Sequence, residues 1–225
     1  ESYRIMSYAT PADTLREKLE RHIIAEEVEV TDATRSFVVL AFPGGLPDQL
    51  SAKPAEGRFE RWNVGFLYRG RRLQRAGTEV LLPAGNLDDI SGECMPEEEA
   101  EIMRIQNGLP MIGVDLTADN NPLEGGVLSA ISFDKGCYLG QEVVARLHRL
   151  QRVGKQRVRF RCSDGSISAG EEILLDGKPV GTVTSVARDP EQGGAVGMAM
   201  VKARLDHREL GAAGGWDTLE VVEPS

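Results

Sequence analysis

The chain has 225 residues, of which 41% are hydrophobic and 27% are charged, and its mean hydropathy is -0.26. These values are typical of a soluble globular protein of one or two domains. No apolar run approaches the roughly 18 residues that a membrane-spanning helix needs, so we expect no membrane partner. The formal net charge of -9 argues against a surface that binds nucleic acid non-specifically.

Residues 11–27 predict the first helix, because Leu15, Leu19 and Ile23 recur every four residues and form one apolar stripe. Strand-like runs follow, and they are Val28–Val30, Phe37–Phe42 and the runs separated by turns within residues 59–83. Pro96–Asn107 predicts a second helix, which opens with proline and acidic residues and stops at Asn-Gly. We expect this part of the chain to be α+β.

Gln141–Leu150 predicts a third helix, and short strands dominate after it. Strict alternation over Gln156–Cys162 indicates a half-buried strand, with its arginines on the side away from the core. The turn Asp176-Gly177 joins two further expected strands, Glu172–Leu175 and Val180–Ala187, into a hairpin. Two more strands are expected at Ala195–Val201 and Leu219–Val222. We therefore predict an α+β fold, with a first domain over residues 1–150 and a small antiparallel β-barrel over residues 151–225.

The three cysteines, Cys94, Cys137 and Cys162, form no CxxC pair. Their number and spacing do not match a secreted disulfide framework or a structural zinc site. Three thiols are also too few for a self-contained four-cysteine iron–sulfur cluster, so we expect no bound metal. The first residues show no signal peptide. A reduced compartment is expected, either the cytoplasm or, in a eukaryote, the mitochondrial matrix.

Positive charge is concentrated in Arg146–Arg161, which contains six arginines and one lysine without an acidic residue. One interpretation is a solvated protein face. The other is a patch for an anionic ligand, such as a polyglutamylated cofactor tail or an RNA backbone. Charge counting leaves both open.

The segment Asp134–Glu142 places Cys137 between two glycines, beside Lys135 and directly before a predicted helix. Glycine lets the backbone approach a ligand closely. The helix N-terminus and the Lys135 ammonium both favour the thiolate form of the cysteine. Such a thiol would be reactive or available as a ligand. A cysteine that packs in a tight turn fits the same residues.

Residues 135–142 read Lys-Gly-Cys-Tyr-Leu-Gly-Gln-Glu. This segment resembles the signature Lys-Gly-Cys-Tyr-x-Gly-Gln-Glu of the YgfZ-type folate-binding proteins, which are relatives of the aminomethyltransferase (T-protein) of the glycine cleavage system. Three further segments are similar to this family or to T-proteins, and they are Met103–Pro110, Asn121–Glu124 and Val180–Ser185. The resemblance begins inside the second lobe of the family, so we expect the N-terminal lobe to be missing.

The resemblance implies T-protein-like folate-binding lobes followed by the C-terminal barrel, with tetrahydrofolate as the cofactor, with or without a polyglutamate tail. It implies that Cys137 is the functional thiol, with Lys135 beside it. The residues that it suggests for folate binding are Glu79, Arg104, Tyr138, Gln141 and Glu142. A folate pterin favours a carboxylate and its glutamate tail favours an arginine.

Other interpretations of single residues stay open. Glu79 also fits an acid on a strand surface, and Arg104 fits a charge on a helix surface. Cys162 is expected in the core because it lies on the apolar side of an alternating strand, and Cys94 is taken as incidental. A nucleophilic pair of Cys137 with His148 is not expected, because the histidine lies about two helical turns away.

The function implied by the resemblance is that of a folate-binding accessory protein that supports iron–sulfur cluster assembly or repair. Its partners would be iron–sulfur proteins or their assembly machinery, and no turnover of its own is required. The first alternative is an aminomethyltransferase that transfers a one-carbon unit to tetrahydrofolate, although T-proteins lack the cysteine motif. The second is a non-catalytic module that docks a protein or RNA through Arg146–Arg161.

Overall fold

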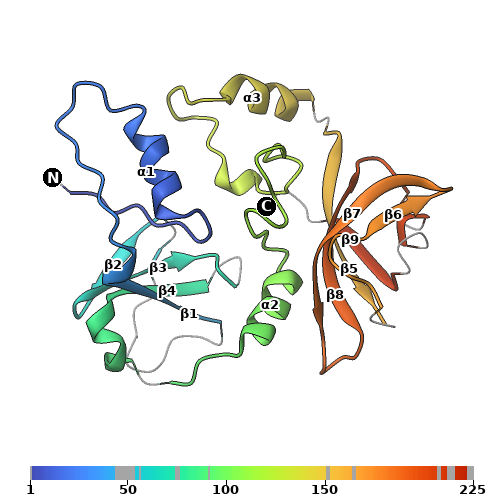
Figure 1. The fold of residues 1–225 in the computed structure, drawn as a ribbon, viewed down its shortest axis with the longest axis horizontal. Helices are drawn as coiled ribbons and strands as arrows, with labels where there is room; N and C mark the ends of the chain where they lie inside the picture. The colour runs from blue at the N-terminus through green and yellow to red at the C-terminus, as the bar shows by residue number, and fades with distance from the viewer. Residues whose placement is uncertain are drawn as a thin grey trace. The chain divides into compact units, whose positions relative to one another are not determined.

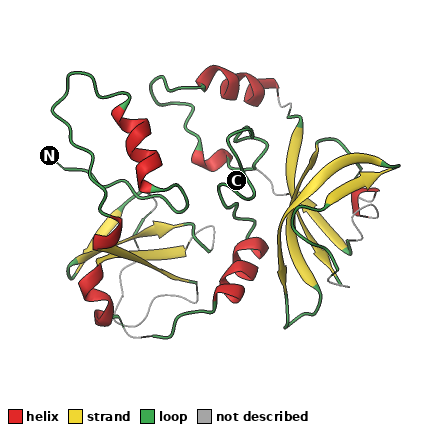
Figure 2. Cartoon of the chain, viewed as in Figure 1, coloured by secondary structure: helices red, strands yellow, loops and turns green. Residues whose placement is uncertain are grey.

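The computed structural model describes residues 2–43, 54–55, 57–73, 77–90, 92–150, 153–163, 166–206, 209–211 and 216–221. The chain divides into two compact units, Glu1–Pro96 and Glu97–Ser225, which we call unit 1 and unit 2 (Figure 1). Each unit combines helices with one antiparallel sheet (Figure 2). The predicted α+β class is therefore confirmed.

Unit 1 contains a four-stranded sheet in the order β1-β4-β3-β2, in which all neighbours are antiparallel. Its strands are β1 (Phe37–Phe42), β2 (Phe59–Trp62), β3 (Gly65–Gly70) and β4 (Gly77–Pro83). A two-residue turn, in which Asn63 has a φ of +47°, joins β2 to β3. Asparagine tolerates this left-handed conformation better than most residues, so the hairpin closes without a glycine there.

The two faces of this sheet have different roles. One face forms a core, and its buried residues are Leu67, Val80 and Leu82, with Val38, Leu40, Phe42, Trp62 and Ile90 packed against them. Because side chains alternate along a strand, the opposite face carries Glu79 and Leu81 of β4 beside Phe66 and Tyr68 of β3. We call this opposite face the outer face. The 3₁₀ segments Thr34–Ser36 and Ala84–Asp89 flank the sheet in sequence.

The first helix is shorter than the sequence predicts. Helix α1 spans Ala12–Glu20 and ends in tight turns in which His22 and Ile23 donate to carbonyls three residues back. The predicted end at residue 27 is therefore wrong, although the apolar stripe is half-buried as expected. Val28–Val30 is not a strand, because it pairs with none of the described strands of the sheet.

Unit 2 contains a five-stranded antiparallel sheet in the order β6-β7-β8-β5-β9. Its strands are β5 (Lys155–Cys162), β6 (Glu172–Leu175), β7 (Lys178–Arg188), β8 (Ala195–Lys202) and β9 (Thr218–Val221). Asp176 and Gly177 both have positive φ and close the predicted hairpin between β6 and β7. Two helices, α2 (Glu97–Gln106) and α3 (Gln141–Leu150), and the 3₁₀ segment Leu128–Ala130 precede the sheet.

The boundary between the two compact units lies after Pro96. Helix α2 packs on the sheet of unit 2, where Ile105 joins Val196 and Met198 in one buried cluster. This contact groups α2 with the barrel strands that follow it, although the sequence placed the helix in the first domain. Across the described residues, no helix combines the length and apolarity that crossing a membrane requires.

Arg157 departs from the alternation predicted for β5. Its side chain is 1% exposed, and it donates from Nε to the Gly125 carbonyl at 2.9 Å and from Nη1 to the Gly108 carbonyl at 2.8 Å. Arg161 on the same strand pairs with Asp189 at 3.2 Å. Both arginines therefore hold unit 2 together, but only Arg157 is buried, because the Arg161 side chain is 24% exposed.

Candidate functional site

Glu79 lies on the outer face of unit 1 with a buried carboxylate, 1% of the residue being exposed. The Tyr68 hydroxyl donates to Oε2 at 2.8 Å, while the Tyr8 hydroxyl and the Arg72 backbone N–H donate to Oε1 at 3.2 and 2.9 Å. Gly70 makes room for this side chain, because a Cβ at that position would overlap the Glu79 carboxyl group. The interpretation as a surface acid is therefore wrong.

A segment near the N-terminus covers this carboxylate. Arg4, Met6 and Tyr8 alternate toward the outer face, as in an extended chain. The Arg4 guanidinium lies 4.9 Å from the centre of the Phe37 ring, the Met6 sulfur lies 3.3 Å from the Tyr68 hydroxyl, and Tyr8 reaches Glu79. Neither Tyr8 nor Tyr68 was expected at the site from the sequence. The alternation of large side chains in residues 4–8 is the sequence pattern that could have indicated Tyr8.

The two tyrosines remain neutral hydrogen-bond donors. Burial raises the pKa of the Tyr8 hydroxyl, and the Glu79 charge raises it further, against an opposing contribution from the Arg71 backbone N–H. Burial and the Glu79 charge also raise the pKa of Tyr68 far above its usual range. The Arg72 guanidinium lies 4.7 Å from the centre of the Tyr8 ring. The Glu79 carboxylate therefore accepts hydrogen bonds from two neutral tyrosine hydroxyls and from the Arg72 backbone N–H.

Arg104 occupies the centre of a buried network in unit 2, with 6% of the residue exposed. Its Nε and Nη2 donate to Glu101, its Nη1 donates to Asp115 at 2.7 Å and to the Leu109 carbonyl, and its Nη2 also donates to Ser185 at 2.9 Å. Burial lowers the pKa of the guanidinium, but Glu101 and Asp115 raise it by more. Arg104 is thus a buried cation, and the interpretation as a surface charge is wrong.

Asp115 is the main hydrogen-bond acceptor of this network, besides Glu101. Its Oδ1 accepts from Thr184 at 2.6 Å and from Ser185 at 2.7 Å, and its Oδ2 accepts from the Met111 backbone N–H at 2.8 Å. The ladder between β7 and β8 shifts register at Thr184. A bulge of this kind lets two consecutive side chains face the same partner. Two of the segments that resemble the T-protein family therefore meet through Asp115.

Every N–H group of Arg104 is engaged within unit 2. A contact from Arg104 to folate would have to replace one of these hydrogen bonds. The residue stabilises the attachment of α2 to β7, and its assignment to folate stays a prediction. Glu79 belongs to unit 1, and the predicted folate residues Tyr138, Gln141 and Glu142 belong to a third group, at the start of α3.

The cysteine motif forms the turn before α3. Cys137 is exposed, and Gly140 has a φ of +85°, which a residue with a side chain rarely adopts. The Gln141 side chain accepts from the Tyr138 backbone N–H at 3.3 Å, and the Lys135 ammonium lies 4.6 Å from the centre of the Tyr138 ring. The structure therefore places Lys135 against the Tyr138 ring and Gln141 against the Tyr138 backbone, while the Cys137 thiol is exposed in the same turn.

The exposure of Cys137 argues against a packing role for this thiol. Cys162 is buried in the core of unit 2, as predicted, and Cys94 is exposed. The His148 ring stacks on Phe133 with 4.3 Å between the ring centres. The Tyr138 hydroxyl is buried and has no hydrogen-bond partner among the described residues. Across all residues that the structure describes, no group of three or more His, Cys, Asp or Glu side chains could hold a metal ion.

Comparison with known proteins relates the C-terminal sheet to one family. Residues 155–220, which span all of β5 to β8 and most of β9, match the family model for the glycine cleavage T-protein C-terminal barrel domain. The aminomethyltransferase of Moorella thermoacetica is 33% identical over 135 residues, covering 59% of this chain and 34% of the relative. The chain is therefore related to the glycine cleavage T-proteins. The match lies within residues 151–225, for which the sequence predicts the barrel, and the predicted domain bounds stay a prediction.

Longer alignments extend the T-protein relationship to unit 1. A chloroplastic protein of Arabidopsis thaliana, named as a candidate transferase, is 27% identical over 216 residues, covering 86% of this chain and 49% of the relative. The aminomethyltransferase of Herpetosiphon aurantiacus is 24% identical over 208 residues, covering 82% of this chain and 57% of the relative. The chain thus spans about half the length of these two relatives.

A solved structure supports the same fold. The glycine cleavage system aminomethyltransferase T from Bartonella henselae superimposes with a TM-score of 0.51 at 21% identity, covering 63% of this chain and 42% of that one. This likeness shows a T-protein-like fold, as predicted.

Proposed function

We propose that this T-protein relative is a tetrahydrofolate-binding accessory protein of the YgfZ type that supports iron–sulfur cluster assembly or repair. The observation that carries the proposal is the exposed Cys137 in the turn before α3, within the motif Lys-Gly-Cys-Tyr-x-Gly-Gln-Glu. A T-protein-like fold supports folate as the cofactor. The iron–sulfur role rests on the resemblance of the motif to the YgfZ family.

The chemistry assigned to Cys137 is that of an accessible thiol. An exposed cysteine can react with a disulfide or an oxidant, or donate its sulfur to a metal, whereas a buried one such as Cys162 cannot. Lys135, whose ammonium stacks on Tyr138, adds positive charge to the same turn.

Glu79 is proposed for the pterin of folate, because a carboxylate accepts two N–H bonds from such a ring. Its Oε1 already accepts from Tyr8 and from the Arg72 backbone N–H. A pterin that binds Glu79 would therefore replace the Tyr8 hydroxyl, which belongs to the segment that covers the outer face. The backbone contact from Arg72 would hold the carboxylate in place during this exchange.

Calorimetric titration with tetrahydrofolate tests the folate part of the proposal. Glu79→Gln keeps the size of the side chain and removes its charge, so the dissociation constant should rise about ten- to a hundredfold. The matched control is Glu60→Gln, which removes an exposed carboxylate of β2 in the same sheet. An unchanged dissociation constant in Glu79→Gln, with an unchanged melting temperature, would remove Glu79 from the site.

Rescue of an iron–sulfur enzyme in cells lacking the native copy tests the role of the thiol. Cys137→Ala should keep the melting temperature and the folate affinity but lose most of the rescue under oxidative stress, where thiolates are vulnerable. Cys94→Ala, which removes another exposed thiol, is the control and should rescue fully. Full rescue by Cys137→Ala would contradict the proposed role.

The second candidate function is that of an aminomethyltransferase, which several relatives carry in their names. It predicts glycine-cleavage exchange activity that survives Cys137→Ala. An accessory protein predicts no such activity. One exchange assay on the wild type and this variant therefore separates the two functions.

A further inference from the structure

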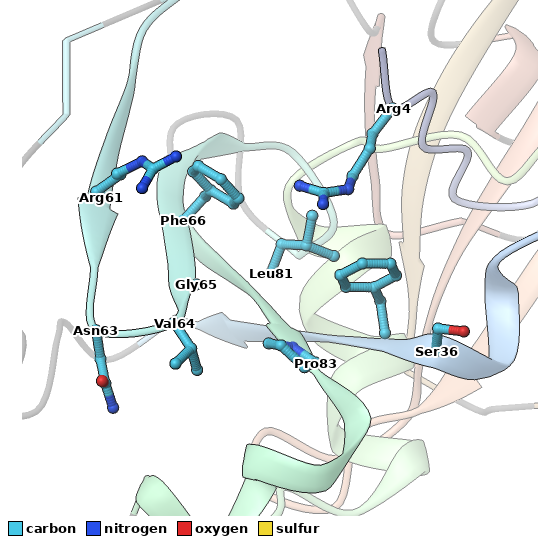
Figure 3. Close-up of a pocket in the computed structure, with 10 residues that line it drawn as sticks. Arg4, Ser36, Arg61, Asn63, Val64, Gly65, Phe66, Leu81 and Pro83 are labelled. Atoms are coloured by element: carbon cyan, nitrogen blue, oxygen red, sulfur yellow. The ribbon is translucent and has the colours of Figure 1, made fainter. Parts of the chain in front are cut away.

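A cavity on unit 1 contains none of the residues assigned above. It has a volume of about 510 Å³ and opens on the outer face of the sheet (Figure 3). Its lining residues come from the N-terminal segment, the 3₁₀ segment Thr34–Ser36, the four strands of the sheet and the turn at Asn63. They are Arg4, Ser36, Phe37, Arg61, Asn63, Val64, Gly65, Phe66, Leu81 and Pro83. This volume is within the range of cavities that hold small organic ligands.

Two guanidinium groups flank an aromatic ring in this cavity. The Arg4 and Arg61 guanidinium groups lie near the Phe66 ring (Figure 3), with each guanidinium carbon 5.7 Å from the ring centre. The Arg4 guanidinium carbon also lies 4.9 Å from the centre of the Phe37 ring. An arginine that stacks on a ring directs its N–H groups away from the ring in the guanidinium plane. These groups are then free to bind an anion.

The charge of the cavity is unbalanced. None of its lining residues is acidic. Within the ranges that the structure describes, neither Arg4 nor Arg61 has a hydrogen-bond or ion-pair partner, and their contacts are with aromatic rings. The chain as a whole has a net charge of -9, so two unpaired arginines beside one cavity give this site a positive charge within a negatively charged protein.

We propose that this cavity binds a ligand that joins a flat ring to an oxyanion, either a carboxylate or a phosphate. The oxyanion would accept hydrogen bonds from Arg4 and Arg61, since a guanidinium matches both groups in bidentate geometry. The ring would lie against the apolar walls formed by Phe37, Phe66 and Leu81. Neither Glu79 nor Tyr8 lines this cavity.

Calorimetric titration of the purified chain with four probes tests the proposal. 2-Naphthoate and adenosine monophosphate carry a ring with a carboxylate or a phosphate, and 2-naphthamide and adenosine are their uncharged counterparts. At least one of the two acids should bind at least tenfold more tightly than its counterpart. The acid that binds better identifies the source of the oxyanion. Equal binding of each acid and its counterpart, or no binding at 10 mM, would overturn the proposal.

Substitutions locate the binding in the cavity. Arg61→Gln and Arg4→Gln should each weaken the bound acid about tenfold, because each removes one charge-assisted contact. Arg69→Gln is the matched control, since it removes an exposed arginine of β3 that does not line the cavity, and it should leave the affinity unchanged. Acetate and inorganic phosphate, which lack a ring, should bind more weakly than the acids. Full affinity in both cavity variants would place the binding elsewhere and refute the assignment.

Discussion

Arg104→Ala should destabilise the protein far more than the loss of an ordinary surface charge. Arg104 and Asp115 are 6% and 2% exposed, and Nη1 and Oδ2 lie 2.7 Å apart. The substitution leaves the carboxylate buried without its cation, although Met111, Thr184 and Ser185 still donate to it. It also removes the side chain that attaches α2 to β7.

The size of the effect follows from this geometry. Breaking a buried ion pair by removing one partner costs roughly 3–5 kcal/mol. Because three donors remain on Asp115, we expect a value near the lower end, about 3 kcal/mol. For a chain of this length, each kcal/mol lowers the melting temperature by about 2–4 °C, so a decrease of about 6–12 °C is expected in thermal unfolding followed by circular dichroism.

A surface ion pair in the same chain provides the control. Arg16 and Asp13 lie 2.8 Å apart with side chains that are 41% and 77% exposed. Arg16→Ala should therefore cost less than about 1 kcal/mol. The contrast between the two variants depends on burial, since the ion-pair distances are nearly equal.

A double-mutant cycle with Asp115→Ala decides whether the pair itself is responsible. Residues in one hydrogen-bonded network couple by about 0.5–3 kcal/mol, so the double variant should be less destabilised than the sum of the single variants. Strict additivity would refute the reasoning. A wild-type melting temperature for Arg104→Ala, together with lost tetrahydrofolate binding, would place the arginine in the folate site instead.

Three further outcomes are expected. A short iodoacetamide pulse near pH 7, followed by mass mapping, should label exposed Cys137 before buried Cys162, and the reverse order would remove the basis for a reactive thiol. In an alkaline titration followed at 295 nm, Tyr8 and Tyr68 should stay protonated above pH 10 while the chain is folded, because burial and Glu79 raise their pKa values. Titration of all four tyrosines of the chain at pH 10 would contradict the hydrogen-bonded cluster around Glu79. Burial raises the pKa of Asp189, but the Gln192 backbone N–H and Arg161 lower it by more. The stability that the Asp189 carboxylate contributes is therefore full above about pH 4 and is lost as the pH falls through its lower folded pKa. Asp189→Asn should cost about 1–3 kcal/mol of unfolding free energy at pH 7, and this cost should shrink in acid. A cost that does not change with pH would contradict this.

Local patterns in the sequence predict most of the secondary structure. The period of Gln141–Leu150 and the alternation of residues 156–162 are properties of a few neighbouring residues, and the structure confirms both elements. The turn Asp176-Gly177 likewise requires positive φ at two consecutive positions, which its residue types favour. Resemblance of motifs, and not local pattern, predicted the T-protein fold.

What the tertiary structure decided concerns the partners of charged side chains. Alternation placed Arg157 on the side of β5 away from the core, yet the carbonyls of Gly108 and Gly125 approach from a distant part of the chain and bury it. Glu79 depends in the same way on Tyr8, which is 71 residues away in sequence. The periodicity of a strand reports which way a side chain points. It contains no information about which distant backbone or hydroxyl group will cover that side, and a buried charge is stable only when such a partner arrives.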